Sequence, residues 1–243
     1  RAGLVSARDT TNSDGSLTGA SDSLIISANT TAGFSILNYT GTGSNETIGH
    51  GLPTVDMIYC FNDAAETAIC GHRGAGWEGN LRLDATSVQS NDPLTFQDHD
   101  PADEIYITVG TNVSINKSST TTTMFCFQGI AGYSAFGSYE GNALADGVVI
   151  NGGIKPTSLF LKNIDSAVNW SSEYTAIETY NPVDLQLRYN LTSAEAAVAT
   201  ADILSNGRKA RDTGTPHNSA HTFVYGIWGT PTLNQSSTPA KAR

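Results

Sequence analysis

The chain has 243 residues, of which 39% are hydrophobic and only 15% are charged, and its formal net charge at pH 7 is -10. A surface this acidic repels a phosphate backbone and offers no basic face to anionic lipid, which excludes nucleic acid and the membrane surface as expected partners. No apolar run in the sequence approaches the length of a membrane-spanning helix. Ser, Thr, Asn and Gly take the place of charged residues, and this composition is typical of a β-rich protein with many turns.

The chain begins with a polar segment and continues as a series of short predicted strands. Residues 1–31 open with Ser, Thr, Asn, Asp and Gly and few apolar anchors, which predicts an N-terminal arm or linker. Beyond this segment, β-branched and aromatic runs alternate with Gly, Asn, Asp and Pro, as strands and turns do. The clearest predicted strands are residues 55–61, 80–84, 104–109, 122–127, 158–162, 184–189 and 221–228.

Two local signals lie near the end of this series. Thr192 and Glu195 have the spacing of a capping box ahead of an Ala-rich stretch, so we expect a short helix near residues 192–201. The pair Asn206-Gly207 is a strong signal for a β-hairpin.

One phrase of sequence occurs twice, as "AGFSILNYTGTG" at residues 32–43 and as "AGYSAFGSYEGN" at residues 131–142. The elements that follow each copy keep the same order, and each series ends on an aromatic strand, "MFCFQGI" or "TFVYGIW". Chance similarity between Gly- and Ser-rich strands is the alternative, but it does not readily preserve order over a whole unit. We therefore predict a tandem duplication.

The duplication predicts the fold class and the domain organisation. A single unit would leave sheet edges unpaired, so we expect an all-β, antiparallel β-sandwich built from two similar units, with little helix. The predicted parts are an arm at 1–31, a first unit at 32–130, a second unit at 131–229 and a C-terminal tail at 230–243.

The three cysteines, Cys60, Cys70 and Cys126, are too few and too odd in number for a disulfide framework. A hairpin turn centred on Ala65 would place Cys60 opposite Cys70, at a distance that permits a disulfide bond. Nothing else in the sequence indicates an oxidising compartment. We therefore predict three free thiols in buried or half-buried strands.

Two groups of residues resemble metal ligands, and neither has the required spacing. His217 and His221 are four residues apart, but they precede a strand rather than share a helix, so we expect a solvated loop and no zinc. An acidic segment could supply oxygen ligands for calcium, but it lacks the spacing of an EF-hand and reads as an acidic loop. Its members are Asp92, Asp98, Asp100, Asp103 and Glu104. No metal or other cofactor is predicted.

Four stretches carry a resemblance to a known family. They are "MFCFQGIAGYSAFGSYEGN" at 124–142, "GGIKPTSLFLKNIDSAVNW" at 152–170, "YNPVDLQLRYN" at 180–190 and "LSNG" at 204–207. Over about residues 32–229 the chain resembles a domain of unknown function found in structural proteins of marine tailed phages, many of which are tail fibres. The first unit fits less well, because it has no Trp at the place of Trp170.

The resemblance implies a virion structural protein of the tail or particle surface, involved in host attachment, and no catalytic residues. It also implies a homo-oligomer, a trimer if the protein is a fibre, in contact with other virion proteins and with a host surface glycan as a further partner. A capsid decoration protein and a carbohydrate-binding module outside any virus are the alternatives. A polysaccharide depolymerase has less support, because the sequence shows no G-x-S-x-G elbow and no convergent acid and base.

The candidate contact residues lie in "GHRGAGWEGN", where Trp77 stands between glycines with Arg73 and Glu78 close by. An exposed indole is unfavourable unless something covers it. A sugar ring or a neighbouring subunit could cover it, with Arg73 and Glu78 supplying hydrogen bonds. The alternative is that the loop folds back and buries Trp77 in its own unit.

Overall fold

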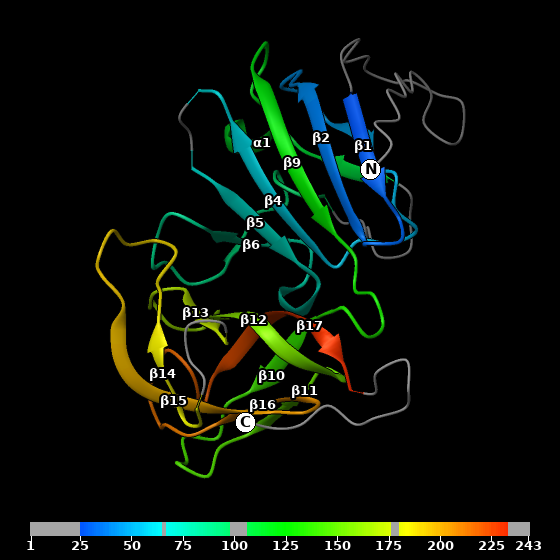
Figure 1. Ribbon diagram of the computed structural model, residues 1–243. Helices are drawn as coiled ribbons and strands as arrows, with labels where there is room; N and C mark the ends of the chain where they lie inside the picture. Colours follow the sequence, from blue (N-terminus) through cyan, green and yellow to red (C-terminus); the bar gives the residue numbers. More distant parts are fainter. Residues whose placement is uncertain (1–24, 65–66, 98–105, 176–179, 233–243) are drawn as a thin grey trace. The chain divides into compact units, whose positions relative to one another are not determined.

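The computed structural model is almost entirely β, and all of its paired strands are antiparallel, which confirms the predicted fold class (Figure 1). The chain divides into two compact units: the first comprises residues 1–83 and 89–128, and the second comprises residues 84–88 and 129–243. The structure describes residues 25–64, 67–97, 106–175 and 180–232. Within these residues, no helix is long and apolar enough to cross a membrane.

The first unit is built on a seven-stranded sheet. Its strands, in spatial order, are β1 (Ile25–Asn29), β2 (Phe34–Thr40), β9 (Thr121–Phe127), β4 (Met57–Asn62), β5 (Ile69–His72), β6 (Gly79–Arg82) and β7 (Ser90–Asn91). A second layer contains the paired strands β3 (Glu46–Gly49) and β8 (Tyr106–Val109) and the short helix α1 (Val113–Asn116), while the 3-10 turn η1 (Arg73–Ala75) links β5 to β6.

Alternation along the strands creates the core of the first unit. Every second residue of β2 and β9 is buried, including Leu37 and Met124, and these side chains share one hydrophobic cluster with Ile48 of β3 and Ile107 of β8. The large sheet and the β3–β8 layer therefore pack face to face, as in a sandwich.

The second unit consists of two four-stranded sheets. One has the order β10 (Ser134–Glu140), β17 (Thr222–Pro231), β12 (Ile154–Asn163) and β13 (Ser171–Tyr174). The other has the order β11 (Val149–Asn151), β16 (Gly207–Ala210), β15 (Ala196–Leu204) and β14 (Val183–Gln186). Ile150, Ile154, Leu159, Leu161 and Ile227 form a buried cluster from residues of both sheets.

The two units share a strand order and its local contacts. The neighbours β2, β9, β4 and β5 of the first unit correspond to β10, β17, β12 and β13 of the second. The two repeated tyrosines also make equivalent hydrogen bonds. The Tyr39 hydroxyl donates to the carbonyl oxygen of Ile115, and the Tyr139 hydroxyl donates to the carbonyl oxygen of His217 at 2.6 Å.

A buried asparagine holds the loop after each repeated tyrosine. Asn116 Oδ1 accepts a hydrogen bond from the backbone N–H of Thr42 at 2.8 Å, and Asn218 Oδ1 accepts one from that of Asn142 at 3.2 Å. Both asparagines are fully buried, so in each unit the side-chain amide bonds the loop from inside the protein and not from its surface. These matched contacts support the tandem repeat.

The predicted helix near residues 192–201 is wrong. Strand β15 occupies residues 196–204 and pairs with β14 on one side and β16 on the other. Two ladders of backbone hydrogen bonds outweigh the helix preference of the Ala-rich stretch, which is worth only tenths of a kcal/mol per residue. The predicted hairpin does form, because β15 and β16 are joined across Leu204 and Gly207.

The predicted boundaries also need correction. Residues 25–29 belong to the segment assigned to the arm, yet they form β1 and pair along their whole length with β2. At the other end, β17 extends to Pro231 and so includes the start of the predicted tail. Residues 84–88 group with the second unit, although the sequence placed them in the first.

Cys60, Cys70 and Cys126 are free and buried, as predicted. The expected register is wrong by one residue, because Cys60 pairs with Ile69 and Cys70 pairs with Tyr59. A shift of one residue turns a side chain to the opposite face of a sheet, so Cys60 and Cys70 point away from each other.

We expect these thiols to react slowly in the native protein. Burial raises the pKa of all three, to about 12 for Cys126, so almost no thiolate is present at neutral pH. A colorimetric thiol reagent should titrate three thiols after denaturation without reductant and essentially none before it. Fewer than three in the denatured chain would contradict the free-thiol assignment.

Candidate functional site

The predicted contact loop folds back on its own unit. His72 Nδ1 accepts a hydrogen bond from the Gly74 N–H at 3.0 Å. Gly76 has a φ of +77°, and its N–H donates a hydrogen bond to the carbonyl oxygen of Arg73. These glycines therefore form a tight turn rather than a flexible loop. Trp77 is only 8% exposed and belongs to the hydrophobic core of the first unit.

Trp77 is therefore buried in its own unit, which is the alternative that the sequence left open, and its indole does not lie at the surface as a ligand contact would. Arg73 and Glu78 remain at the surface. The Arg73 side chain is 53% exposed and lies 3.4 Å from a carboxylate oxygen of Asp56. The structure thus does not assemble the three predicted residues into one contact site.

The acidic segment is described only in part. Asp92 Oδ2 accepts hydrogen bonds from Asn112 at 2.6 Å and from Thr95 at 3.0 Å, so it braces the loop around it. The other four acidic residues, at positions 98, 100, 103 and 104, lie outside the described residues. Among the residues that are described, no group of three or more His, Cys, Asp or Glu side chains could hold a metal ion.

The sequence predicted a solvated loop around His217, and this prediction is wrong for His217. It is buried, with Nδ1 2.8 Å from Asp212 Oδ2 and Nε2 3.2 Å from Gln186 Oε1. His221 is half-buried, and its Nδ1 lies 3.0 Å from Ser219 Oγ. The two histidines therefore serve separate polar contacts within the second unit.

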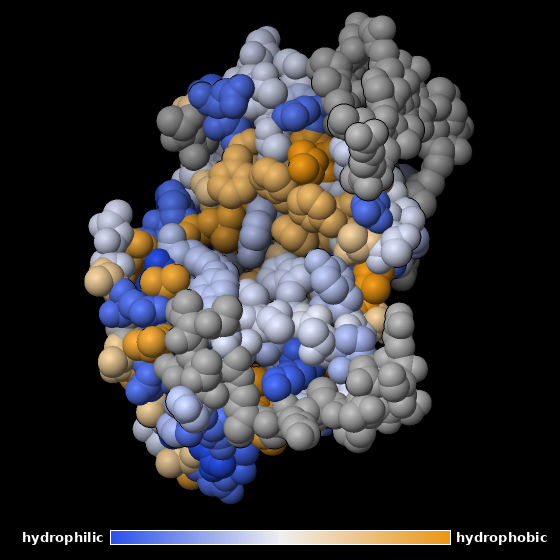
Figure 2. All heavy atoms as spheres, viewed as in Figure 1, coloured by the Kyte–Doolittle hydropathy of each residue, from blue (hydrophilic) through white to orange (hydrophobic). Residues whose placement is uncertain are grey.

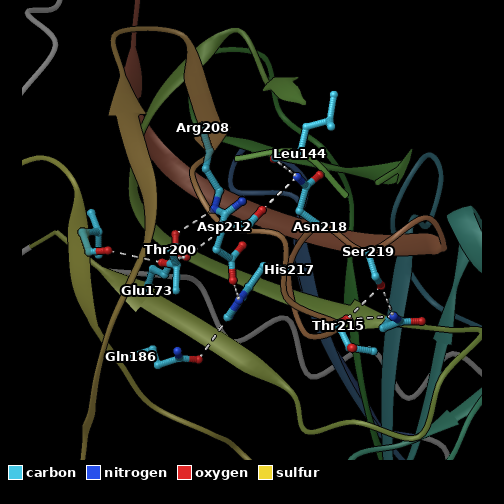
Figure 3. A network of polar contacts seen from close by, with 12 residues as sticks. Leu144, Glu173, Gln186, Thr200, Arg208, Asp212, Thr215, His217, Asn218 and Ser219 are labelled. Atoms are coloured by element: carbon cyan, nitrogen blue, oxygen red, sulfur yellow. Dashed lines mark hydrogen bonds and ion pairs between the residues drawn. The ribbon is translucent and has the colours of Figure 1, made fainter. Parts of the chain in front are cut away.

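A buried ion pair lies at the centre of these contacts (Figure 3). Arg208 donates two hydrogen bonds to Glu173, from Nε at 2.9 Å and from Nη2 at 2.7 Å, and the Thr200 hydroxyl donates a third at 2.7 Å. Glu173 belongs to β13 of one sheet, whereas Arg208 and Thr200 belong to β16 and β15 of the other. The pair therefore joins the two layers of the second unit.

Each charge of this pair is compensated by the other and by hydrogen bonds. Burial alone would raise the pKa of Glu173, but the charge and hydrogen bonds of Arg208 outweigh it and lower that pKa. Both groups therefore remain charged at neutral pH. Nothing in the sequence indicated this pair, because its members are 35 positions apart and follow no motif.

A second feature is an aromatic surface on the large sheet of the first unit. Strands β2, β4 and β9 direct alternate side chains away from the core, and five of these are rings that we call the aromatic face. They are Phe34, Tyr59, Phe61, Phe125 and Phe127. Figure 2 shows hydrophobic side chains gathered on one face of the first unit.

The rings of the aromatic face contact one another across the strands. The centroids of Phe34 and Phe127 are 5.1 Å apart, those of Tyr59 and Phe127 are 5.4 Å apart, and those of Phe61 and Phe125 are 5.9 Å apart. Phe61 is 42% exposed and the other four are partly exposed. The outward positions of β2, β4 and β9 carry no charged residue. An apolar surface of this kind marks an interaction site more often than an ordinary sheet exterior does.

A family described as "Domain of unknown function (DUF7483)" matches residues 4–230, which is nearly the whole chain. The chain belongs to this family. The matched segment includes both the aromatic face and the buried ion pair of the DUF7483 domain. No match was found among curated proteins or among solved structures.

Lys162 is a further buried charge in the DUF7483 domain. It lies on β12, and its Nζ donates hydrogen bonds to the carbonyl oxygens of Val168 at 2.6 Å and Thr86 at 3.1 Å. Burial lowers the pKa of this amine to about 8. The folded protein therefore releases this proton more easily than the unfolded chain does.

We expect Lys162 to make stability depend on pH above neutrality. Between pH of about 8 and the unfolded lysine value of about 10.4, the unfolded state binds the extra proton, so the free energy of unfolding rises with pH. Lys162→Met should remove this rise, which urea unfolding at pH 7.5, 8.5 and 9.5 would measure. Lys155→Met on the same strand is the matched control, and identical pH slopes for wild type and Lys162→Met would contradict the assignment.

Proposed function

We propose that this chain is a structural module at the surface or tail of a tailed-phage particle, and that its aromatic face binds an uncharged glycan of the host surface. The aromatic face is the observation that carries the binding part of this proposal. The particle is proposed from the resemblance of the repeated motifs to structural proteins of marine tailed phages.

The chemistry of the aromatic face favours a sugar. The C–H faces of pyranose rings pack on aromatic side chains, and nearby amide and hydroxyl groups bind their hydroxyls. Asn38 and Thr123 supply such groups on the same side of β2 and β9, where the Thr123 hydroxyl donates to Asn38 Oδ1 at 2.7 Å. Because no charged side chain lies at these outward positions, an uncharged polysaccharide fits better than an acidic one.

The same lack of charge argues against a second copy as the main occupant. Two copies of a chain with net charge -10 repel each other, and the aromatic face has no cation to offset this repulsion. The homo-oligomer implied by the family resemblance, a trimer in a fibre, would then form through other surfaces.

The buried groups of the second unit suit a scaffold. The interior of the sandwich contains Glu173, Arg208 and His217, which make their polar contacts with other side chains of the second unit. A polymer substrate has no access to these buried groups. This arrangement supports a binding protein over a polysaccharide depolymerase.

Mass spectrometry of purified phage particles tests the particle component directly. Detection of the chain at a fixed copy number supports a virion protein. Its absence from particles would favour a carbohydrate-binding module outside a virus, and its presence without glycan binding would favour a decoration protein.

Affinity electrophoresis in gels that contain neutral polysaccharide tests the binding face. Phe61→Ala and Tyr59→Ala should each weaken retardation on the order of tenfold, because aromatic anchors dominate binding energies. Tyr180→Ala is the matched control, since Tyr180 is a 78% exposed ring in the second unit. Equal retardation of all three variants and the wild type would exclude the aromatic face as the binding site.

A further inference from the structure

The second unit contains two Asn-Gly pairs, Asn151-Gly152 at the end of β11 and Asn206-Gly207 at the β15–β16 hairpin. An asparagine before a glycine is prone to deamidation, because glycine has no side chain to hinder attack by its nitrogen on the asparagine amide. The two pairs are in contact, since Asn206 Nδ2 lies 3.4 Å from Asn151 Oδ1. Their local structures nevertheless differ, and this difference decides which of them can react.

Asn151 is exposed, and its side-chain oxygen already receives two donors. Oδ1 accepts hydrogen bonds from the Gly153 N–H at 3.1 Å and from Asn206 Nδ2 at 3.4 Å. The bond from Gly153 closes a small ring that contains both Asn151 Cγ and the Gly152 nitrogen, so the two atoms that would react stay within one turn. N–H donors directed at a carbonyl oxygen stabilise the negative charge that develops there when the carbon is attacked.

The peptide between Asn151 and Gly152 can also rotate. Residue 152 lies between β11 and β12 and belongs to neither strand. The backbone hydrogen bond at this turn comes from the Gly153 N–H, which donates to the carbonyl oxygen of Asn206 at 3.1 Å, and not from the Gly152 N–H. Gly153 has a φ of +68°, a conformation that glycine adopts without strain. The Gly152 nitrogen can therefore turn toward Asn151 Cγ while the strands stay paired.

The second pair is held by the sheet. Gly207 is buried, closes the hairpin opposite Leu204 and pairs with Asn151 of β11. The closing pair of a two-residue hairpin exchanges both of its backbone hydrogen bonds, so the Gly207 nitrogen cannot turn toward Asn206 Cγ without opening the hairpin. A Cβ atom added to Gly207 would lie 1.9 Å from the carbonyl oxygen of Ile150, which shows how closely the β11 backbone approaches this peptide.

We propose that Asn151 is a deamidation site of the folded chain. The Gly152 nitrogen gives its proton to hydroxide and forms a bond to Asn151 Cγ, while the Cγ–Nδ2 bond breaks and Nδ2 takes up a proton and leaves as ammonia. Water then adds to either carbonyl carbon of the cyclic imide, the bond from that carbon to the ring nitrogen breaks, and the product is aspartate or isoaspartate. No oxidant or reductant takes part. Asn206 keeps its amide as long as the hairpin is folded.

The reaction changes both the charge and the backbone of the second unit. Each conversion adds one carboxylate to a chain whose formal net charge is already -10. Isoaspartate also inserts an additional carbon into the main chain at the point where β11 pairs with β16. The modification does not depend on the glycan binding proposed for the aromatic face, which belongs to the first unit.

Peptide mapping by mass spectrometry tests the proposal. The full chain is incubated at mildly alkaline pH in water labelled with a heavy oxygen isotope, once folded and once in urea. In the folded chain we expect Asn151 to lose its amide on the order of tenfold faster than Asn206, and in urea we expect similar rates, because neither turn persists there. Isoaspartate that carries one heavy oxygen identifies the cyclic route. Equal rates in the folded chain, or an Asn151 amide that persists in it, would overturn the proposal.

Two variants identify the reacting groups. Gly152→Ala places a methyl group beside the attacking nitrogen and should slow the conversion of Asn151. The added Cβ would lie 3.3 Å from the flexible end of the Ile227 side chain and 3.5 Å from Ala135 Cβ, so the unit should still fold. Asn151→Gln is the matched control, because its longer side chain would have to close a larger ring, and it should abolish the acidic shift of the folded chain in isoelectric focusing. An unchanged rate in Gly152→Ala, or an acidic shift that persists in Asn151→Gln, would contradict the assignment.

Discussion

Replacing Glu173 by Ala is expected to lower the free energy of unfolding by about 3–5 kcal/mol, because the change leaves Arg208 buried without its counter-ion. Arg208 loses two charge-assisted hydrogen bonds and Thr200 loses one, at a place in the interior where all three side chains are buried. The loss should appear as faster amide hydrogen exchange in β13, β15 and β16, with β2 and β9 of the first unit as the internal reference.

Two further variants separate the ion pair from general damage. Asp146→Asn removes a carboxylate that contacts Lys209 at the surface, and it should leave stability essentially unchanged. The double change Glu173→Met with Arg208→Met removes both charges and should recover much of the loss. A double variant as unstable as Glu173→Ala would mean that volume, and not the unpaired charge, causes the effect.

The pH dependence of this effect follows from the lowered pKa of Glu173. A carboxylate with a lowered folded pKa stabilises the protein above its unfolded value, and this contribution is lost as pH falls through the folded pKa. The difference in stability between the wild type and Glu173→Ala should therefore shrink in acid. A difference that stays constant down to acid unfolding would contradict a lowered pKa of Glu173 in the folded protein.

Local sequence patterns predicted the strands well where alternation and turn residues agree. Residues 122–127 alternate in burial within β9, and the Asn206-Gly207 pair marks the β15–β16 hairpin. The repeated Tyr39 and Tyr139 also identified two units, because each tyrosine anchors the same kind of loop.

Patterns failed where pairing with other strands decides the outcome. The Ala-rich stretch after Glu195 forms a strand and not a helix because β14 and β16 pair with it on either side, and a capping pattern carries no information about these partners. The prediction that Cys60 lies opposite Cys70 was also wrong. The length of the turn between β4 and β5 determines which residues lie opposite each other, and the cysteines do not.

The candidate site was harder to predict than the fold. Glu173 and Arg208 are ordinary charged residues in the sequence, and only the packing of two sheets brings them together. The rings of the aromatic face come from three strands that are adjacent in space but distant along the chain. A Trp between glycines looked more functional than these rings, because sequence alone does not show which way a glycine turn directs its side chain.

Trp77→Ala is expected to lower the free energy of unfolding of the first unit by about 3–5 kcal/mol. The indole is 8% exposed and packs in the same cluster as Ile58 and Phe96, so its removal leaves a cavity that the surrounding strands cannot fully close. Amide hydrogen exchange in β4, β5 and β6 measures the loss without relying on the fluorescence of the residue removed. Trp77→Phe, which keeps part of the volume, should cost clearly less.

Arg73→Ala and Glu78→Ala are the matched controls, since both side chains lie at the surface of the same turn. Each should change stability by less than about 0.5 kcal/mol, as surface substitutions usually do. Trp77→Ala should also reduce glycan retardation only as far as it unfolds the first unit, whereas Phe61→Ala should reduce retardation in a folded protein. If Trp77→Ala keeps wild-type protection in β4 and β5 but no longer binds the glycan, then the indole is a contact residue after all and its burial is not structural.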